Sequence, residues 1–303
     1  MKKIEEKLSI IITSYNRVEL LDRTLSQLMY SPIRNCRITI LDNHSTSDTR
    51  GVFVRYKDSF PTISFHVHKV NLGGGCENYI HAIDYCDTEY MWILADDDTY
   101  NWGYFADVEE HILSADVDLI QVGAHNDGPW DWGAVDTPRN LLKKGYKYLK
   151  YSSFLPCTIF RYDYFCRYIK DAYDFIHFRY PHFPSLVSAY ENDTPIYVSK
   201  TRIVTAEIGA QAYNYYVCIR GFVFASDYLS CKNDRREMLH SVMEGLSFPK
   251  IYHYVYYKYR DKKNIEYTLA KMLELFSFQE RILAVCLKKL YVFTKNLQSI
   301  ILK

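Results

Sequence analysis

Three consecutive acids are the residues of this sequence most suited to chemistry. Asp96, Asp97 and Asp98 directly follow the apolar run YMWILA at 90–95. Adjacent carboxylates repel and raise one another's pKa, so we do not expect stability alone to retain them. Mg²⁺ and Mn²⁺ prefer oxygen ligands, commonly one or two carboxylates with water and substrate phosphate. The three acids therefore predict a divalent-cation site, unless one merely caps a following helix and the others are solvated.

Three further polar segments occupy comparable places along the chain. TSYNR follows the apolar run at 8–13, DNHSTSD begins at the end of the run at 36–42, and NLGGG at 71–75 follows the run at 62–68. Glycines let a backbone approach a phosphate and expose amide groups at a helix N-terminus. A tight strand-to-helix turn explains the same glycines, and the two interpretations are compatible.

The elements that must position these residues alternate in type. Apolar, β-branched runs predict the strands, and helical spacing predicts helices between them, near 17–30, 47–57, 75–86 and 103–114; the strands are expected at 8–13, 36–42, 62–68, 90–95 and 117–123. This alternation predicts an α/β fold with a mostly parallel, Rossmann-like sheet flanked by helices. Ligands of such sheets bind beyond the carboxyl ends of the strands, where all four polar segments are expected to meet.

Composition narrows the function and the location. The 37 Lys and Arg nearly balance the 36 Asp and Glu, which disfavours nucleic acid as a partner. The eight cysteines form no CxxC pair, and the apolar stretch near the N-terminus is too short for a signal peptide, so we expect reduced thiols and a cytoplasmic protein.

The C-terminal part differs in character. Residues 211–303 are helical in period, and from Arg281 onward the chain has five basic residues and no acid. These features predict a helical C-terminal subdomain whose last helix suits the inner face of an anionic membrane. The alternative is a helix packed on the catalytic domain or on a second copy in a homo-oligomer.

The four polar segments together resemble a known family. Four stretches of the chain are similar to the successive signatures of the family 2 glycosyltransferases. They are SIIITSYNRVELLDRTLSQL, ITILDNHSTSDT, NLGGGCENYIHAI and EYMWILADDDTY. This resemblance implies a GT-A fold and an inverting, metal-dependent enzyme that uses a nucleotide-diphosphate sugar. No GxGxxG follows the first strand and no GxxxxGK[ST] occurs, so neither a dinucleotide-binding nor a P-loop enzyme is favoured.

The resemblance also assigns roles to individual residues. Thr13 and Tyr15 match positions that contact the nucleoside, and Asp42 matches the acid that bonds the base, which favours a UDP-sugar. Asp96 is expected to face the ribose and the metal, with Asp97 or Asp98 binding the cation directly. Arg17 and Asn71 lie in matching segments but could equally hold the loops together. Asn78 matches the asparagine after the glycine loop or makes a structural bond inside the helix, and Gly73 lies in the phosphate loop or in a tight turn.

The catalytic base departs from the family pattern. In the family it is usually an Asp in an ED pair that opens a helix, and no such pair occurs in the expected region. The position falls on or beside His182, at the start of a helix predicted over 181–190 and before a predicted strand PIYV. Histidine has a pKa near neutrality and can act as a base. Asp174, His177 and Glu191 are the alternatives.

The resemblance thus implies a hexosyltransferase-type glycosyltransferase that moves a sugar to a saccharide or lipid-linked saccharide, in building a bacterial surface polysaccharide. We expect a catalytic domain over 1–210, with a nucleotide-sugar half at 1–125 and an acceptor half at 126–210. Two alternatives remain open. One is a non-catalytic nucleotide-sugar binding protein on the same fold, and the other is a nucleotidyltransferase.

Overall fold

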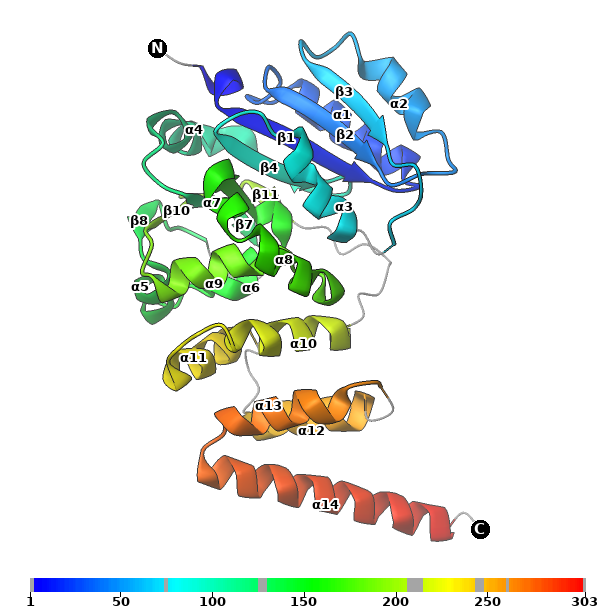
Figure 1. The fold of residues 1–303 in the computed structure, drawn as a ribbon, viewed down its shortest axis with the longest axis vertical. Coiled ribbons are helices and arrows are strands. Elements are labelled where there is room, and N and C mark those ends of the chain that lie inside the picture. The colour runs from blue at the N-terminus through cyan, green and yellow to red at the C-terminus, as the bar shows by residue number, and fades with distance from the viewer. Residues whose placement is uncertain are drawn as a thin grey trace. The chain divides into compact units, whose positions relative to one another are not determined.

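The computed structural model describes residues 3–73, 76–124, 130–205, 215–242, 248–259 and 262–301. The chain divides into two compact units, Met1–Ala212 and Tyr213–Lys303 (Figure 1). The N-terminal unit holds the sheets, and the C-terminal unit consists of helices.

The main sheet of the N-terminal unit has the strand order β3-β2-β1-β4-β9-β6-β10-β8. Its parallel half contains β1 (Leu8–Ser14), β2 (Arg37–Asp42), β3 (Ile63–Val67) and β4 (Tyr90–Ala95). Every residue of β1 and β4 is buried, which explains their continuous apolar runs. The mostly parallel sheet expected from the sequence is confirmed.

The other half of the sheet is mixed. β9 (Thr158–Arg161) runs antiparallel between β4 and β6 (Leu119–Gln121), β10 (Ile196–Val198) is parallel to β6, and β8 (Ala134–Asp136) forms an antiparallel edge. The predicted strand at 117–123 ends early. Val122 leaves the sheet because its N–H donates to Cys157 while its carbonyl oxygen accepts from Ile203 and Val204.

A small second sheet has the order β5-β11-β7. β5 (Thr99–Tyr100) begins directly after Asp98, and β11 (Val204–Thr205) pairs with both β5 and β7 (Gly123–Ala124). The Asn101 N–H also donates to the Ile203 carbonyl at 2.7 Å. This sheet therefore fixes the chain on the far side of the three acids.

The helices of the N-terminal unit cover the sheet. α1 and α2 pack against each other, whereas α3 lies in front of the strands in Figure 1. Their bounds are α1 (Val18–Met29), α2 (Thr49–Tyr56), α3 (Cys76–Ile80), α4 (Phe105–Ser114), α5 (Pro138–Lys143), α6 (Tyr148–Ser152), α7 (Tyr162–Arg167), α8 (Ile169–Phe175) and α9 (Phe183–Glu191). Short 3-10 helices lie at Ile4–Glu6, His81–Tyr85, Trp102–Tyr104, Leu155–Cys157 and Ile176–Phe178.

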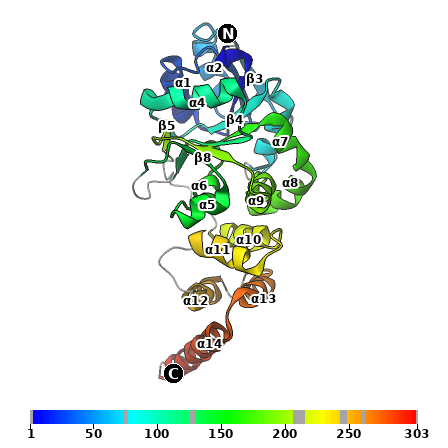
Figure 2. The same cartoon turned by 90° about the vertical axis from the view of Figure 1, so that its left-hand side faces the viewer.

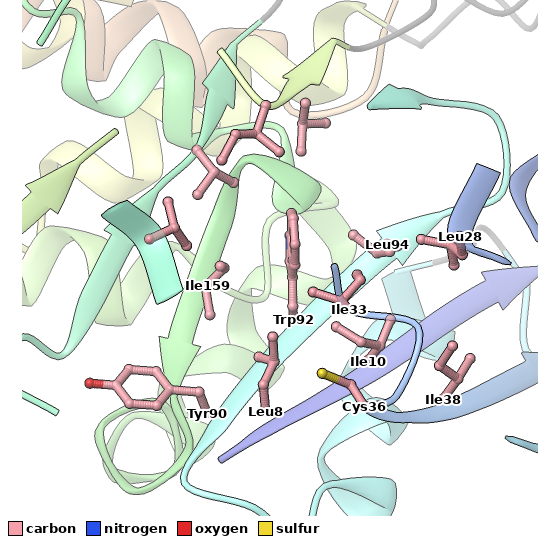
Figure 3. Packing of buried hydrophobic residues seen from close by; sticks show 14 of the residues in the cluster. Leu8, Ile10, Leu28, Ile33, Cys36, Ile38, Tyr90, Trp92, Leu94 and Ile159 are labelled. Atoms are coloured by element: carbon pink, nitrogen blue, oxygen red, sulfur yellow. The ribbon is translucent and has the colours of Figure 1, made fainter. Parts of the chain in front are cut away.

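The core lies between the parallel strands and α1 and α4. Leu8, Ile10, Trp92 and Leu94 point into it from β1 and β4 (Figure 3), and the indole N–H of Trp92 donates to the Pro156 carbonyl at 2.8 Å. α1 contributes the buried leucines of its apolar face, Leu21, Leu25 and Leu28. Close packing of this kind holds β1 and β4 in fixed register, so the residues at their ends are also fixed.

The C-terminal unit is helical, as expected from the sequence. Its helices are α10 (Tyr215–Ser226), α11 (Lys232–Val242), α12 (Phe248–Tyr259), α13 (Ile265–Leu275) and α14 (Phe278–Ile301). α10 packs on α11, and α12 packs on α13 and α14 (Figure 2). Within the described ranges, no helix has the length and apolar character needed to cross a bilayer.

Candidate active site

The strand register brings the predicted site residues to one edge of the sheet. Ser14 at the end of β1 pairs with Asp42 at the end of β2, and Thr13 pairs with Ala95 just before the acids. Thr13 is buried, whereas Tyr15 is 42% exposed. The carboxyl ends of β1, β2 and β4 therefore present Tyr15, Asp42 and Asp96 from adjacent strands.

Asn16 ties the loop after β1 to the loop after β2. Its side-chain oxygen accepts from the Thr46 N–H at 2.7 Å and the Ser47 N–H at 3.1 Å, and its own N–H donates to the Ser45 hydroxyl. Asn16 has a φ of 54°, a left-handed conformation that Asn adopts more readily than most residues. This link holds Tyr15 beside the Asp42 loop.

Asp42 is almost wholly engaged within the protein. Oδ1 accepts from the Ser45 N–H at 2.7 Å, and Oδ2 accepts from the hydroxyls of Ser45 and Thr49 at 2.6 and 2.8 Å. Its side chain is 1% exposed. In this arrangement Asp42 shapes the loop and the start of α2, and any contact with a nucleotide base would be through the remaining acceptor capacity of Oδ1.

Asn43 organises the glycine-containing loop. Its side chain accepts from the Leu72 N–H at 2.9 Å and donates toward Asn71 Oδ1 and the Gly73 carbonyl at 3.4 Å. Asn71 Oδ1 in turn accepts from the Gly73 N–H at 2.7 Å, and Gly73 has a φ of 107° that requires glycine. Gly74 and Gly75 of the predicted phosphate loop lie outside the described residues.

Asn78 anchors the helix that follows this loop. It is buried, and its side-chain amide donates to the Leu41 carbonyl at 3.0 Å while its oxygen lies 2.8 Å from His68 Nε2. Since the amide oxygen can only accept, His68 carries its proton on Nε2. Asn78 thus connects α3 to the end of β2, a holding role that the sequence left open.

Arg17 bridges two of the three acids. Its Nη1 donates to Asp96 Oδ1 and to Asp97 Oδ2, both at 2.8 Å, and the Ser14 hydroxyl donates to Asp96 Oδ2 at 2.6 Å. Burial raises the pKa of Asp96 to about 6, although Arg17 and Ser14 act to lower it. Burial would lower the pKa of Arg17, but Asp96 and Asp97 raise it overall, so the guanidinium stays charged.

The backbone of the acid segment is held by α1. The Thr24 hydroxyl donates to the Asp96 carbonyl at 3.0 Å, Arg23 donates to the Asp97 carbonyl at 2.6 Å, and the Gln27 amide donates to the Asp98 carbonyl at 3.2 Å. These three contacts come from two successive turns of one helix, with Arg23 and Thr24 in the first and Gln27 in the second. They fix the positions of carboxylates whose mutual repulsion would otherwise move them apart.

The three acids differ in access to solvent. Asp97 is 17% exposed in its side chain, Asp96 is almost completely buried and Asp98 is fully buried. Asp98 lies close enough to raise the pKa of Tyr100, after the larger effect of burial. A cation arriving from solvent therefore meets Asp97 first, and coordination by Asp98 requires its side chain to become accessible.

The carboxylate oxygens of this segment suit a hard divalent cation that takes some of its ligands from the protein and the rest from a substrate. Asp97 offers a carboxylate oxygen to solvent from a backbone held by α1, and Asp98 would add one if its side chain became accessible; carboxylate oxygens suit Mg²⁺ or Mn²⁺. Across the residues described, no group of three or more His, Cys, Asp or Glu side chains is arranged as a self-sufficient metal site. The remaining ligands would be water and the phosphate oxygens of the donor, as is common for Mg²⁺.

His182 does not have the access that a general base needs. It is 1% exposed, and its Nε2 lies 3.0 Å from the Ser152 carbonyl oxygen, so Nε2 carries a proton. Burial lowers its pKa to about 4. The residue precedes α9, as the sequence predicts, but its ring is packed among Phe160, Tyr180 and Phe183.

The alternatives to His182 lie at the surface. Asp174 near the end of α8 and His177 in the following 3-10 helix are exposed, while Glu191 at the end of α9 is partly buried. Access alone therefore favours Asp174 and His177.

Sequence reasoning missed the residues that hold the site together. The contacts that orient the acids and the glycine loop come from Ser14, Asn43, Thr24 and Gln27. One signal was available for Thr24, which is a polar residue on the apolar face of α1 beside Leu21, Leu25 and Leu28. The others are indistinguishable in sequence from solvated loop and helix residues.

Comparison with known proteins gives the family. The sequence model described as Glycosyl transferase family 2 matches residues 9–175. A GalNAc(5)-diNAcBac-PP-undecaprenol beta-1,3-glucosyltransferase from Campylobacter jejuni is 25% identical over 92 residues, which are 30% of this chain and 30% of that protein.

Solved structures share the fold at low identity. TarS 1–349 from S. aureus, in complex with UDP-GlcNAc, has a TM-score of 0.63 at 16% identity, covering 91% of this chain and 83% of that chain. A longer TarS chain matches at 16% identity with a TM-score of 0.59. The match covers 92% of this chain but only 55% of that chain. The mannosyltransferase PcManGT from Pyrobaculum calidifontis, in complex with GDP-Man and Mn²⁺, has a TM-score of 0.56 at 12% identity, covering 94% of this chain and 80% of that chain.

The structural matches agree with the arrangement of the sheet. Because the family model covers more than half of the chain, from residue 9 to residue 175, the protein belongs to glycosyltransferase family 2 and has a GT-A fold.

Proposed function

We propose that the protein transfers a sugar, with inversion, from a nucleotide-diphosphate donor to a hydroxyl group of an acceptor. The observation that carries the proposal is the acid segment at the end of β4, whose side chains meet Arg17 and whose backbone is held by α1. Loops from β1, β2 and β3 converge on the same edge of the sheet. The nucleotide-sugar half is residues 1–125 and the acceptor half is residues 126–210.

The chemistry of such a transfer assigns work to these side chains. The leaving diphosphate gains negative charge in the transition state, and a divalent cation, when bound, neutralises it as a Lewis acid. Asp97 and Asp98 would hold the cation, Asp96 would orient the ribose, and Arg17 would keep Asp96 ionised despite its burial. Thr13, Tyr15 and Asp42 would contact the nucleoside, with the Asn71–Gly73 loop beside the phosphates.

The donor and the acceptor are proposed from the relatives. UDP-GlcNAc and UDP are bound in TarS structures, and an undecaprenol diphosphate-linked saccharide appears in the name of the Campylobacter glucosyltransferase. We therefore favour a UDP-sugar as donor and a saccharide or lipid-linked saccharide as acceptor. A role in assembling a bacterial surface polysaccharide is consistent with such an acceptor.

The general base is proposed to come from the segment between Asp174 and Glu191. Access favours Asp174 and His177 over the buried His182. Single substitutions Asp174→Asn, His177→Gln, His182→Gln and Glu191→Gln separate these options. Loss of the base should reduce transfer by roughly a hundredfold or more while nucleotide affinity is unchanged.

Release of nucleoside diphosphate tests the proposed activity. The purified chain would be incubated with UDP-glucose, UDP-GlcNAc and GDP-mannose, each with Mn²⁺ and again with chelator. Metal-dependent release from one donor, lost in Asp97→Asn or Asp98→Asn, is the expected result because water can take the place of the acceptor hydroxyl. Release that persists in both variants would remove the acid segment from the reaction.

A further inference from the structure

α14 begins with a capping box. The Ser277 hydroxyl accepts from the Glu280 N–H at 3.3 Å, and Glu280 Oε2 accepts from the Ser277 N–H at 2.8 Å. Glu280 also pairs with Arg236 of α11 at 2.6 Å, and the Arg236 hydrogen bond is the main reason that its pKa falls to about 2. The one acid in the first turn of α14 is therefore neutralised inside the C-terminal unit.

One side of α14 packs on α12. Ala284 is completely buried, and the Lys288 ammonium lies 4.7 Å from the centre of the Tyr256 ring. Ala284 and Lys288 are four residues apart and thus lie on the same side of the helix. This side accounts for the attachment of α14 to its unit.

The opposite side is apolar and open. We call it the outer face of α14; its exposed apolar residues are Phe278, Ile282, Leu283, Val285, Leu290 and Val292. Phe278 is 78% exposed and Leu290 is 60% exposed. The spacing of three and four residues places Ile282, Val285 and Lys289 along one row of the helix surface. Leu283 and Leu290, seven residues apart, form a neighbouring row. Large side chains exposed in a continuous row mark an interaction surface.

The charged residues of α14 after its first turn are all basic. Arg281 and Lys289 are exposed along it, and no Asp or Glu occurs from residue 281 to residue 303. An apolar face with Lys289 within it and Arg281 at its edge matches a surface that is apolar inside and negatively charged outside, because a lysine side chain can extend its ammonium group to the headgroups. A symmetric contact with a second copy would instead bring these basic residues against each other, because the same patch is used by both subunits.

We propose that the outer face of α14 docks on an anionic phospholipid surface. The helix would lie in the plane of the interface, with Phe278, Ile282 and Leu290 among the acyl chains and Arg281 and Lys289 at the headgroup phosphates. The docking is independent of sugar transfer and brings an enzyme of this kind to lipid-linked acceptors.

Vesicle flotation of the full chain tests the proposal without any activity measurement. The protein would be mixed with vesicles of phosphatidylcholine alone or with about one third phosphatidylglycerol, at low and high salt. We expect flotation only with the anionic vesicles and a decrease at high salt, because the basic contribution is screened. Absence of flotation with either vesicle, or equal flotation with both, would overturn the proposal.

Matched variants assign the contact to the outer face. Ile282→Gln combined with Leu290→Gln should weaken vesicle binding by about tenfold or more, since burial of apolar side chains is lost. Lys289→Gln should weaken it by about fivefold. Val54→Gln on α2, which replaces an equally exposed apolar residue of the other unit, should bind as the unmodified chain does.

Light scattering distinguishes a lipid surface from a second copy. In size-exclusion chromatography with light scattering, the unmodified chain and the Ile282→Gln, Leu290→Gln double variant should have the same mass. Both proteins should bind nucleotide equally. A dimer that dissociates on these substitutions would assign the outer face to self-association and overturn the proposal. Variants that bind vesicles as well as the unmodified chain would also overturn it.

Discussion

Arg17 stabilises two carboxylates that would otherwise repel each other in a buried place. A single nitrogen lies 2.8 Å from both Asp96 Oδ1 and Asp97 Oδ2. Removing one partner of such a pair leaves uncompensated charge, which costs several kcal/mol when fully buried. Arg17 itself is 30% exposed, so solvent reduces this cost.

Arg17→Ala is therefore expected to lower the free energy of unfolding by about 2 kcal/mol. Mn²⁺ alone should raise the unfolding temperature of this variant more than that of the unmodified chain, because the freed carboxylates can take a cation. Thermal unfolding with and without Mn²⁺ measures both effects. Arg55→Ala, which breaks an exposed pair with Asp22, serves as the control. Equal Mn²⁺ shifts in Arg17→Ala and the unmodified chain would contradict the account.

His182 should make stability depend on pH. Burial places its pKa at about 4 in the folded chain, against about 6.5 when unfolded. Below pH 6.5 the unfolded chain binds a proton that the folded chain does not, so stability falls as pH decreases toward 4. The full effect is roughly 3 kcal/mol for a shift of this size.

Urea unfolding between pH 4.5 and 7.5 measures this slope. His182→Gln should be less stable at pH 7 but lose less stability on acidification, because the variant lacks the titrating ring. The difference between the two proteins isolates His182 from other groups such as Asp96. Parallel pH profiles would show that the ring is solvated rather than buried.

For individual residues, the sequence predicted the positions of the site residues better than their contacts. The acids were identified because three carboxylates after an apolar run have few other uses. The hydrogen bonds of Asp42 with Ser45 and Thr49, and the burial of His182, depend on side-chain packing that no local pattern encodes.

The small β5-β11-β7 sheet is the element that fixes the acid segment from its far side. β5 follows Asp98, and β11 joins it to β7. Gly123 in β7 allows the close approach, since a Cβ atom there would lie 2.4 Å from the Val204 carbonyl oxygen. That distance is too short for any residue other than glycine without movement of the backbone.

Gly123→Ala should therefore separate β7 from β11 and lower the free energy of unfolding by about 2 kcal/mol. Nucleotide affinity should also fall, because β5 shifts with β11. Gly103→Ala is the matched control, since its Cβ would meet Asn101 Oδ1 at 3.4 Å, an ordinary contact. Chemical denaturation and calorimetry report the two effects, and an unaffected Gly123→Ala would contradict the role of this sheet.

The elements were predictable where hydrophobic periodicity is long. The four parallel strands and α1, α2 and α4 lie where the sequence predicts them. β9 was missed because four residues after a 3-10 turn carry too little pattern, and its antiparallel pairing depends on strands far away in the chain. The helix predicted at 75–86 is a short α3 followed by a 3-10 helix.

At the scale of the whole molecule, every described residue of the candidate donor site belongs to the unit Met1–Ala212. The division falls where the sequence changes from alternating strand and helix patterns to helical period alone. The C-terminal unit carries the outer face of α14. The proposed donor chemistry and the proposed surface docking are thus assigned to different units of one chain.

Calorimetry of nucleotide binding tests the central claim most directly. UDP, GDP, CDP and dTDP would each be titrated into the full chain with Mn²⁺ and again with chelator. We predict that one of them, UDP by preference, binds with micromolar affinity in Mn²⁺ and at least about tenfold more weakly in chelator or in Asp97→Ala and Asp98→Ala. Absence of binding by any nucleotide to the folded protein, or affinity unchanged by chelator and by both substitutions, would contradict a metal-dependent donor site at the end of β4.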